Sequence, residues 1–321
     1  MAWPSCTALS ASGDVTMGWW PEMRTLYRAL VAGVLTLVCA IAPASALTVV
    51  GDDGMALTLS KPATRVVTLL PSLAEVVCDL GACDRLVGID RYTNWPPETA
   101  NVAVVGGGLD PQLEAILRLR PDLIVMAPSA RVIARLRDLG LPVLALEPKR
   151  MADLARTYRA LGEALGIAEA DARFTQLQSD LGVLKRSVDA SWLGARVYFE
   201  VSDELYAAGP DSFVGELLTR LGFDNAIASG LGPFPKISPE WVVRANPDVL
   251  VVSEQSFRRL TQRPGWSGIP AIANRQVCAM PQVQADALVR PGPRLVAGAQ
   301  WLVRCINQLE RSWPASKDSQ R

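Results

Sequence analysis

The sequence contains no histidine, and this absence excludes several kinds of functional site. None of its 321 residues supplies an imidazole. Ser-His-Asp and Cys-His catalytic groups are therefore excluded, together with metal centres built on histidine. Acid–base chemistry by carboxylates alone, ligation by tyrosinate and simple binding stay open.

An excess of charge of either sign is also missing. The chain has 32 basic and 32 acidic side chains, so its net charge is zero. A neutral chain lacks the basic surplus that draws proteins to nucleic acid, and we expect no nucleic-acid partner. Half of the residues are apolar and a fifth are charged, which is typical of a globular protein.

The longest apolar run is too short to be a membrane anchor. Residues 29–42 form a run of fourteen, preceded by Arg24 and Arg28 and followed by the small residues Ala44 and Ala46. A membrane span needs about twenty apolar residues, whereas this pattern is typical of a secretory signal peptide. We predict a signal peptide over residues 1–46, with translation starting at Met1 or at Met23. The exported chain is expected to be soluble in the periplasm.

One stretch of sequence occurs twice. Residues 113–125 align without gaps to residues 239–251, and both copies contain a glutamate early and a Pro-Asp pair late. Asp110-Pro111 lies just before the first copy, and Ser238-Pro239 spans the start of the second. Each pair predicts the N-cap and the first residue of a helix. Apolar β-type residues follow each Pro-Asp pair. Each copy is therefore read as helix, turn and strand, within two duplicated α/β lobes.

The remaining patterns agree with a doubly wound α/β fold. Predicted strands alternate with predicted helices, which favours parallel sheets. We expect strands at residues 66–70, 86–89, 123–126, 143–146 and 195–201, and helices at 72–80 and 294–309. The predicted organisation is an N-terminal lobe at 47–150, a helical connector at 151–192, a C-terminal lobe at 193–312 and a polar tail at 313–321. The connector breaks at Gly166-Ile167 and then continues as a long helix over residues 169–188.

Together these segments resemble a known family. Residues 65–75, residues 86–90, the two Glu…Pro-Asp copies and the Tyr92…Trp95-Pro96 loop are similar to periplasmic solute-binding proteins of the helical-backbone class. These proteins serve ABC importers of vitamin B12, haem and iron siderophores, and the resemblance covers residues 61–312. It is strongest to the vitamin B12 binders. It implies two lobes joined by one long helix, a ligand cleft between the lobes, no catalysis, and no cofactor, since cobalamin is the transported ligand.

The resemblance also implies a membrane partner. In the family, one glutamate on each lobe docks onto arginines of an ABC permease dimer, and Glu114 and Glu240 hold matching places in the two copies. Alternatively, an acidic residue in the first turn of a helix only complements the helix dipole. We expect a monomer that delivers its ligand to the permease.

The predicted ligand site lies in loops that follow strands, where α/β sheets bind their ligands. Tyr92 and Trp95 offer flat rings for a large planar ligand, although Trp95 can instead pack against Pro96. Gly107 and Gly108 either admit a ligand or only shape a turn, and their loop lacks the aromatic residue that B12 binders often carry. The predicted ligand-binding residues are Leu70, Pro71, Ser72, Tyr92, Trp95, Gly107, Gly108, Tyr206, Phe234, Asp286 and Arg290. Asp286 and Arg290 either bind amide groups of a corrin or form a surface ion pair.

Four cysteines remain after residue 46, namely Cys78, Cys83, Cys278 and Cys305. Disulfides are expected in an oxidising compartment. Of three possible connectivities, we favour pairing within each lobe, Cys78 with Cys83 and Cys278 with Cys305. A metal–thiolate site fits poorly, because the spacing differs from that of zinc sites and histidine is absent.

Three other functions stay open at this point. A haem binder would need a tyrosinate ligand, for which Tyr92 is the candidate. A ferric-siderophore binder would use converging arginines such as Arg91, Arg290 and Arg294. A secreted hydrolase would need two carboxylates about 5–10 Å apart, whereas Glu114 and Glu240 are expected on separate lobes.

Overall fold

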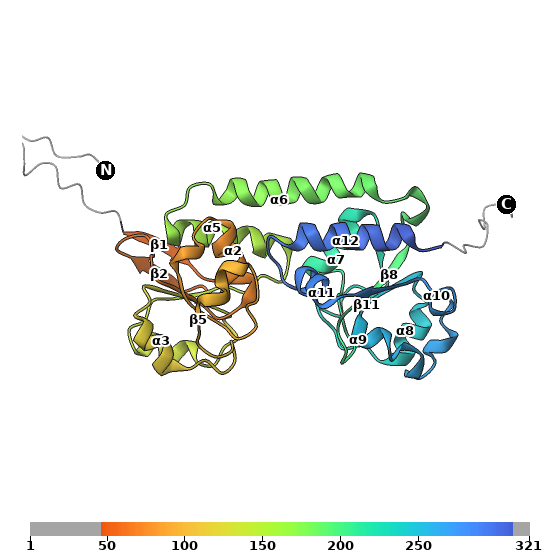
Figure 1. Ribbon diagram of the computed structural model, residues 1–321, viewed down its shortest axis with the longest axis horizontal. Helices are drawn as coiled ribbons and strands as arrows, with labels where there is room; N and C mark the ends of the chain where they lie inside the picture. The colour runs from red at the N-terminus through yellow and green to blue at the C-terminus, as the bar shows by residue number, and fades with distance from the viewer. Residues whose placement is uncertain (1–45, 311–321) are drawn as a thin grey trace, which may run out of the picture. The chain divides into compact units, whose positions relative to one another are not determined.

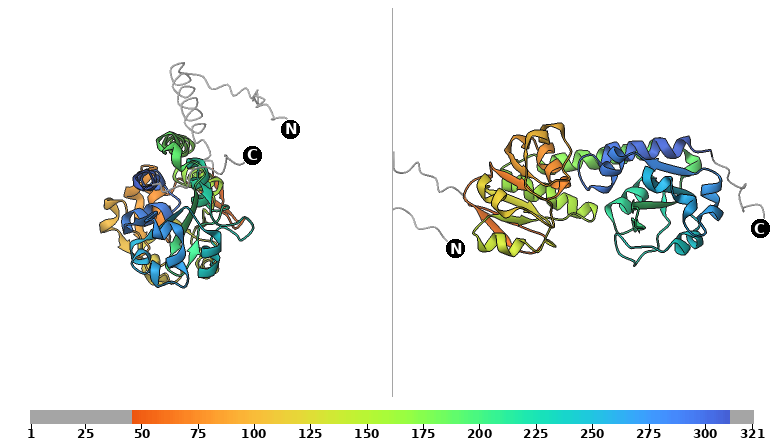
Figure 2. Two further views of the ribbon diagram at one scale, coloured as in Figure 1. Left: turned by 90° about the vertical axis from the view of Figure 1, so that its right-hand side faces the viewer. Right: turned by 60° about the horizontal axis from the view of Figure 1, so that its bottom comes forward.

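The computed structural model describes residues 46–310. The expected tail at 313–321 and all of the expected signal peptide except Ala46 lie outside the described residues. Within them, the chain builds two parallel β-sheets, each with helices on both faces (Figures 1 and 2). We call the two layered units the N-terminal lobe and the C-terminal lobe. The α/β class with two parallel sheets is thus as the sequence predicts.

The sheet of the N-terminal lobe is wholly parallel, in the order β5-β4-β3-β6-β7. Its strands are short apolar runs, as expected for strands that are covered on both faces. Their bounds are β3 Val66–Thr68, β4 Leu86–Ile89, β5 Ala103–Val104, β6 Leu123–Met126 and β7 Val143–Ala145. A separate hairpin, β1 Leu47–Val50 with β2 Ala56–Leu59, precedes the sheet. The helices are α2 Pro71–Asp79, α3 Leu113–Leu119 and α4 Ile133–Asp138, with 3₁₀ turns at Cys83–Arg85 and Pro97–Asn101.

The sheet of the C-terminal lobe has the order β10-β8-β11-β12, with β9 added to β8 in antiparallel sense. The strands are β8 Arg196–Ser202, β9 Tyr206–Ala207, β10 Asp224–Asn225, β11 Val249–Ser253 and β12 Val277–Met280. The helices are α7 Phe213–Leu221, α8 Pro239–Ala245, α9 Glu254–Phe257, α10 Pro270–Ala273, α11 Gln282–Val289 and α12 Leu295–Gln308. Further 3₁₀ turns lie at Leu260–Gln262 and Trp266–Gly268.

Two helices connect the lobes. α5 (Met151–Leu165) ends at Gly166, whose positive φ of 69° closes the helix at the predicted break. α6 (Ala170–Leu184) continues as a 3₁₀ turn, Lys185–Ser187, and lies beside α12 (Figure 1). One apolar core includes buried residues of both sheets, α2, α5, α6, α7 and α12, and each lobe has a second core on the other face of its sheet. The chain thus packs both lobes against shared helices.

The repeated segment has the same architecture in both lobes. α3 and α8 each end in a residue of left-handed conformation, Arg120 (φ 47°) and Asn246 (φ 44°), which are 126 positions apart. Two residues after each of these, an aspartate accepts a hydrogen bond from a backbone N–H at the entrance to a strand. Asp122 accepts from Arg65 at 2.7 Å, and Asp248 accepts from Arg196 at 2.7 Å. The Pro-Asp motif therefore joins each helix end to the first strand of its sheet.

The two copies differ at their first turn. Ser238 caps α8 as predicted, since its hydroxyl accepts from the N–H of Trp241. The prediction for Asp110-Pro111 is wrong, because α3 begins at Leu113 and its N-cap is Gln112. Asp110 pairs instead with Arg91 at 2.5 Å, and Pro111 bridges to Gly106. Tertiary contacts of the loop thus displace the start of the helix.

Asp122 gives a testable prediction on stability. Burial raises its pKa, but hydrogen bonds from the N–H groups of Arg65 and Thr64 and from the Thr64 hydroxyl outweigh burial and lower it. A carboxyl whose pKa is lowered in the folded state stabilises the fold at pH values above its unfolded-state pKa of about 3.9. This contribution is lost as the pH falls through the folded-state pKa. We expect Asp122→Asn to lower the free energy of unfolding by about 1–2 kcal/mol at pH 7. Because asparagine does not titrate, the variant should then lose less stability between pH 7 and pH 3 than the unsubstituted protein does. Urea titrations at pH 7 and pH 3 measure this, with the exposed Asp138→Asn as control; equal losses in both variants would contradict it.

Both disulfides of the described chain form within a lobe. Cys78 on α2 is joined to Cys83, and Cys278 on β12 is joined to Cys305 on α12. This is the connectivity that the sequence favours, and it leaves these four cysteines unavailable as thiolate ligands. Among residues 46–310, no cluster of three or more Cys, Asp or Glu side chains is arranged to hold a metal ion.

Candidate functional site

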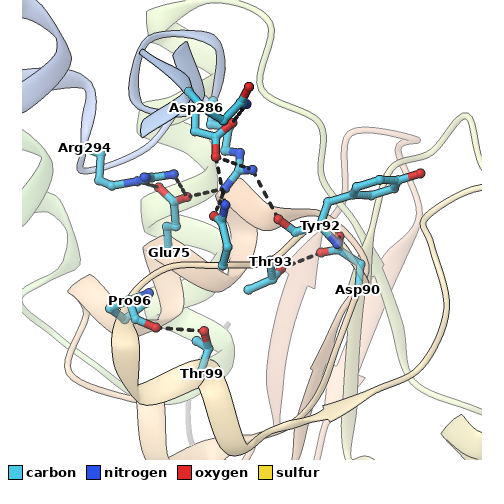
Figure 3. Close-up of polar contacts among 11 residues, drawn as sticks. Glu75, Asp90, Tyr92, Thr93, Pro96, Thr99, Asp286 and Arg294 are labelled. Atoms are coloured by element: carbon cyan, nitrogen blue, oxygen red, sulfur yellow. Dashed lines mark hydrogen bonds and ion pairs between the residues drawn. The ribbon is translucent and has the colours of Figure 1, made fainter. Parts of the chain in front are cut away.

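The candidate site lies where the carboxyl ends of the two sheets meet. In parallel sheets the loops after the strands form the usual binding edge. On the N-terminal lobe these loops lead into α2 after β3 and into residues 90–96 after β4. On the C-terminal lobe the loop after β12 leads into α11 and then α12. Side chains of these four segments contact one another directly (Figure 3).

The loop after β4 is held firmly in place. Asp90 is buried and accepts hydrogen bonds from the N–H of Tyr92 (2.8 Å) and the hydroxyl of Thr93 (2.6 Å). The N–H of Arg91 bonds to Gly106 at 2.7 Å. The peptide bond between Trp95 and Pro96 is cis, and the Pro96 carbonyl accepts from Thr99 at 2.8 Å. The loop is therefore a fixed platform, and it presents the ring of Tyr92, which is 63% exposed.

Four charged side chains with little solvent exposure and one exposed amide join the lobes. We call this group the ion cluster: Glu75, Asn94, Asp286, Arg290 and Arg294. The carboxylate of Glu75 is 0% exposed and pairs with Arg294 at 2.6 Å and with Arg290 at 3.3 Å. Arg290 also pairs with Asp286, one turn earlier on α11, at 3.1 Å. Two carboxylates and two guanidinium groups balance one another, which offsets the cost of burying charge.

Asn94 completes the ion cluster from the loop after β4. Its Nδ2 donates to Asp286 at 2.9 Å, and its Oδ1 accepts from Arg290 at 2.7 Å. Arg290 also donates to the backbone carbonyl of Tyr92 at 3.2 Å. Figure 3 shows dashed contacts that join the labelled Glu75 of α2 and the loop carrying Tyr92 to the region of Asp286 and Arg294. The ion cluster thus sets the distance between the Tyr92 loop and α11.

Arg294 has the buried partner that its place at a helix start requires. A cation at a helix N-terminus is unfavourable for the dipole. Here the bidentate pairing with Glu75 compensates, through Nε at 3.0 Å and Nη2 at 2.6 Å. The guanidinium also lies over the ring of Trp95, 5.6 Å from its centre. Trp95 is therefore a partner of Arg294 and lines a hollow of about 460 Å³ with Glu75 and Arg294.

Exposed apolar side chains gather after the strands of both sheets. Tyr92 follows β4 and Tyr206 lies just beyond β8; Lys236 lies over the Tyr206 ring, 5.4 Å from its centre. Three further exposed apolar residues at such positions are not predicted from the sequence: Leu109 after β5, Phe257 at the end of α9 after β11, and Val283 near the start of α11 after β12. No local signal separates an exposed from a buried apolar residue in a loop or at a helix end, so only the tertiary structure identifies these three residues.

Other predicted ligand residues have evident packing roles. Leu70 and Pro71 start α2, and Ser72 is buried. A side chain at Gly108 would lie 2.7 Å from the carbonyl of Leu69, and one at Gly107 would lie 2.5 Å from Asp110. Phe234 is half-buried and packs against Phe213, with ring centres 5.9 Å apart. In the structure these residues therefore pack against neighbouring parts of the chain.

A second hollow lies at the same edge of the C-terminal lobe. It measures about 430 Å³ and follows the ends of β11 and β12. Its polar lining includes Gln255, Arg258, Arg259 and Gln282. Arg259 is paired with Asp203 at 3.1 Å.

The two glutamates of the repeat are on the surface. Glu114 lies in the first turn of α3 and Glu240 in the first turn of α8, and both are exposed. Hydrogen bonds from its own N–H and from the Ser238 hydroxyl, with the nearby charge of Arg244, lower the pKa of Glu240. Each lobe therefore carries an exposed glutamate at an equivalent position.

Comparisons with known proteins agree with this architecture. A family described as periplasmic binding protein matches residues 66–283. A Bacillus subtilis protein named uncharacterized ABC transporter substrate-binding lipoprotein YvrC is 30% identical, over 78% of this chain and 82% of its own length. The vitamin B12-binding protein of Vibrio cholerae is 28% identical, over 73% of this chain and 85% of its own.

A solved structure matches both lobes. The crystal structure of the periplasmic vitamin B12 binding protein BtuF of Vibrio cholerae superposes with a TM-score of 0.64 at 26% identity, covering 77% of this chain and 97% of that one. In the part of the chain described here, every helix is too short or too polar to cross a membrane. Because the family match covers more than half of the sequence, the chain belongs to the periplasmic binding proteins and is a non-catalytic substrate-binding component of an ABC importer, acting outside the cytoplasm.

Proposed function

We propose that this protein captures cobalamin or a related corrinoid in the periplasm and delivers it to an ABC permease. The observation that carries the proposal is the composition of the edge where the lobes meet. Exposed rings, Tyr92 and Tyr206, stand at the carboxyl ends of both sheets. Between the lobes, Asp286 and Arg290 supply an acceptor and a donor. A macrocycle with apolar faces and an amide-bearing rim matches both kinds of group.

The related proteins support the same ligand. The vitamin B12-binding protein and the solved BtuF structure, both from Vibrio cholerae, carry vitamin B12 binding in their names. A cobalamin-binding protein of Halobacterium salinarum is 29% identical over 75% of this chain. In this proposal Leu70, Pro71, Ser72, Gly107 and Gly108 shape one wall of the cleft. Trp95, which lies under Arg294, and Phe234, which packs on Phe213, belong to the same proposed site.

Haem is the second candidate, because the phenol of Tyr92 is exposed. Tyr206 is the other exposed tyrosine of the described chain. Burial, and then the charge of Asp79, raises the pKa of Tyr158 far above its usual range. Burial, and then the charge of Glu200, does the same to the pKa of Tyr198. Those two stay neutral, so haem ligation would depend on Tyr92 or Tyr206.

A ferric siderophore is less well matched. Catecholate and carboxylate siderophores carry net negative charge with iron bound and call for uncompensated arginines. Here Arg91 pairs with Asp110, and Arg290 and Arg294 share Glu75. The cleft arginines therefore carry little net positive charge toward a ligand.

Ligand titration tests the proposal. We expect cobalamin to bind in isothermal titration and haem to give no Soret shift. Tyr92→Ala and Tyr206→Ala should each weaken cobalamin binding about tenfold, since each removes a stacking face. Leu139→Ala, at an exposed apolar residue after α4, is the matched control and should leave Kd unchanged. A Soret band that Tyr92→Ala abolishes, without cobalamin binding, would favour haem. Mass spectrometry of co-purifying ligand gives an independent answer.

We further propose that Glu114 and Glu240 dock onto the permease, one from each lobe. Their exposure and their equivalent places in the repeat support this role. Two carboxylates on separate lobes define an orientation, which a single contact would not. We expect the protein to act as a monomer on the permease dimer.

A further inference from the structure

The side chain of Asn94 is bound as a ligand would be. It is a primary carboxamide, and both of its ends are engaged across the lobes. Its NH₂ group donates to the carboxylate of Asp286 at 2.9 Å, while its oxygen accepts from the guanidinium of Arg290 at 2.7 Å. Asp286 can only accept and Arg290 can only donate. The pair therefore selects a group with one donor and one acceptor side by side.

Asp286 and Arg290 are positioned independently of Asn94. Asp286 on α11 and Arg290 at the C-cap of that helix are four residues apart and bond to each other at 3.1 Å. Gln282 donates to the other oxygen of Asp286 at 2.8 Å. Glu75 and the carbonyl of Tyr92 hold the guanidinium of Arg290 at 3.3 and 3.2 Å. The pair would therefore keep its geometry if Asn94 moved away.

Asn94 itself lies at the surface. Asn94 is exposed, whereas the side chains of Asp286 and Arg290 are only 9% and 14% exposed. Rotation of one short side chain toward solvent would uncover both partners. Tyr92, the proposed ligand-facing ring, is two residues away in the same loop.

We propose that Asn94 is a built-in competitor that occupies a carboxamide-binding pair, Asp286 and Arg290, until a ligand amide displaces it. The inference rests on the proposed function and deepens it, because it names the group of the ligand that is recognised. A primary amide can replace Asn94 with its bonds conserved. A carboxylate would face the like charge of Asp286, which is unfavourable in a poorly solvated site. The ligands selected are those with primary amides on their rim.

The competitor lowers affinity in a calculable way. The apparent Kd of a ligand rises in inverse proportion to the fraction of molecules whose site is free. If Asn94 occupies the pair in about nine molecules of ten, its removal strengthens amide binding about tenfold, or about 1.4 kcal/mol. If Asn94 only held the lobes together, its removal would weaken ligand binding or leave it unchanged, and would not strengthen it.

A small probe tests the pair without reference to the natural ligand. The Nε resonance of Arg290, assigned from its loss in Arg290→Lys, is followed by NMR during titration with propionamide or propionate. In Asn94→Ala we expect propionamide to shift this resonance at about tenfold lower concentration than in the unsubstituted protein, and propionate to have no effect. An equal response in both proteins, a lack of response in Asn94→Ala, or a response to propionate would overturn the proposal.

A control variant separates competition from a loosened loop. Thr93→Ala removes the 2.6 Å bond to Asp90 but keeps the Asn94 amide. It should leave the propionamide response unchanged, and a gain equal to that of Asn94→Ala would overturn the proposal.

Cobalamin provides the second readout. Asn94→Ala should bind it about tenfold more tightly, and equal binding to both proteins would overturn the role of Asn94 in ligand selection. If neither protein binds cobalamin while propionamide behaves as expected, the proposed ligand is wrong and the amide-binding pair stands.

Discussion

Replacement of Glu75 by glutamine is expected to lower the free energy of unfolding by about 3–5 kcal/mol, since it removes one partner from a buried ion cluster. The Glu75 carboxylate is 0% exposed, and it pairs with two guanidinium groups that are 14% and 11% exposed. Glutamine has nearly the same volume, so packing is preserved and the loss reports the charge. The remaining Asp286 would face two buried arginines alone. Urea unfolding followed by tryptophan fluorescence measures the effect.

A nearby glutamate and a double variant make this prediction specific. Glu98 lines the same hollow but is exposed, so Glu98→Gln should change stability by less than about 0.5 kcal/mol. Glu75→Gln combined with Arg294→Met should cost less than the sum of the two single changes, because each removes the partner of the other charge. A Glu75→Gln protein within 1 kcal/mol of the unsubstituted one, on the order of ordinary surface changes, would show that the cluster contributes no net stability.

The elements of the fold are predictable because their signals are local. The strands at 86–89 and 123–126 have the bounds that their apolar runs predict, and Gly166 ends α5 where the pattern breaks. The gapless repeat predicts two lobes of the same design. The start of α3 differs because Asp110 and Pro111 are engaged in the loop, where Asp110 pairs with Arg91 and Pro111 bridges to Gly106. A capping motif is a local preference, and a tertiary contact can override it.

The site is predictable only in outline. Position after a strand identifies Tyr92 and Tyr206, and the family resemblance identifies Asp286 and Arg290. Nothing in the local sequence shows that Glu75, within an apolar helix, pairs with arginines more than 200 positions later. The same holds for Asn94 and its partners on α11. Such pairs depend on how the two lobes pack, which single-sequence patterns do not encode.

The second large effect is expected on transport. Alanine at both Glu114 and Glu240 should reduce cobalamin uptake by about tenfold or more, while the Kd for cobalamin stays unchanged. Both side chains are exposed on separate lobes and remote from the ion cluster in sequence and fold. Their charges would meet arginines of the permease, so their loss affects docking rather than ligand capture. Uptake of radiolabelled cobalamin by cells that carry only the variant measures the first quantity, and isothermal titration measures the second.

Single variants and a matched control decide between docking and a local helix effect. Hydrogen bonds from its own N–H and from the Ser238 hydroxyl, with the charge of Arg244, lower the pKa of Glu240 and favour its ionised form. Charge reversal, Glu240→Arg, should therefore impair uptake more than Glu240→Ala does. If Glu240 served only the dipole of α8, both changes would lower thermal stability and leave uptake intact. Glu163→Ala, an exposed glutamate on α5, should alter neither quantity. Because each lobe contributes one carboxylate to the docking orientation, each single alanine variant should lower uptake, and the double variant should lower it most.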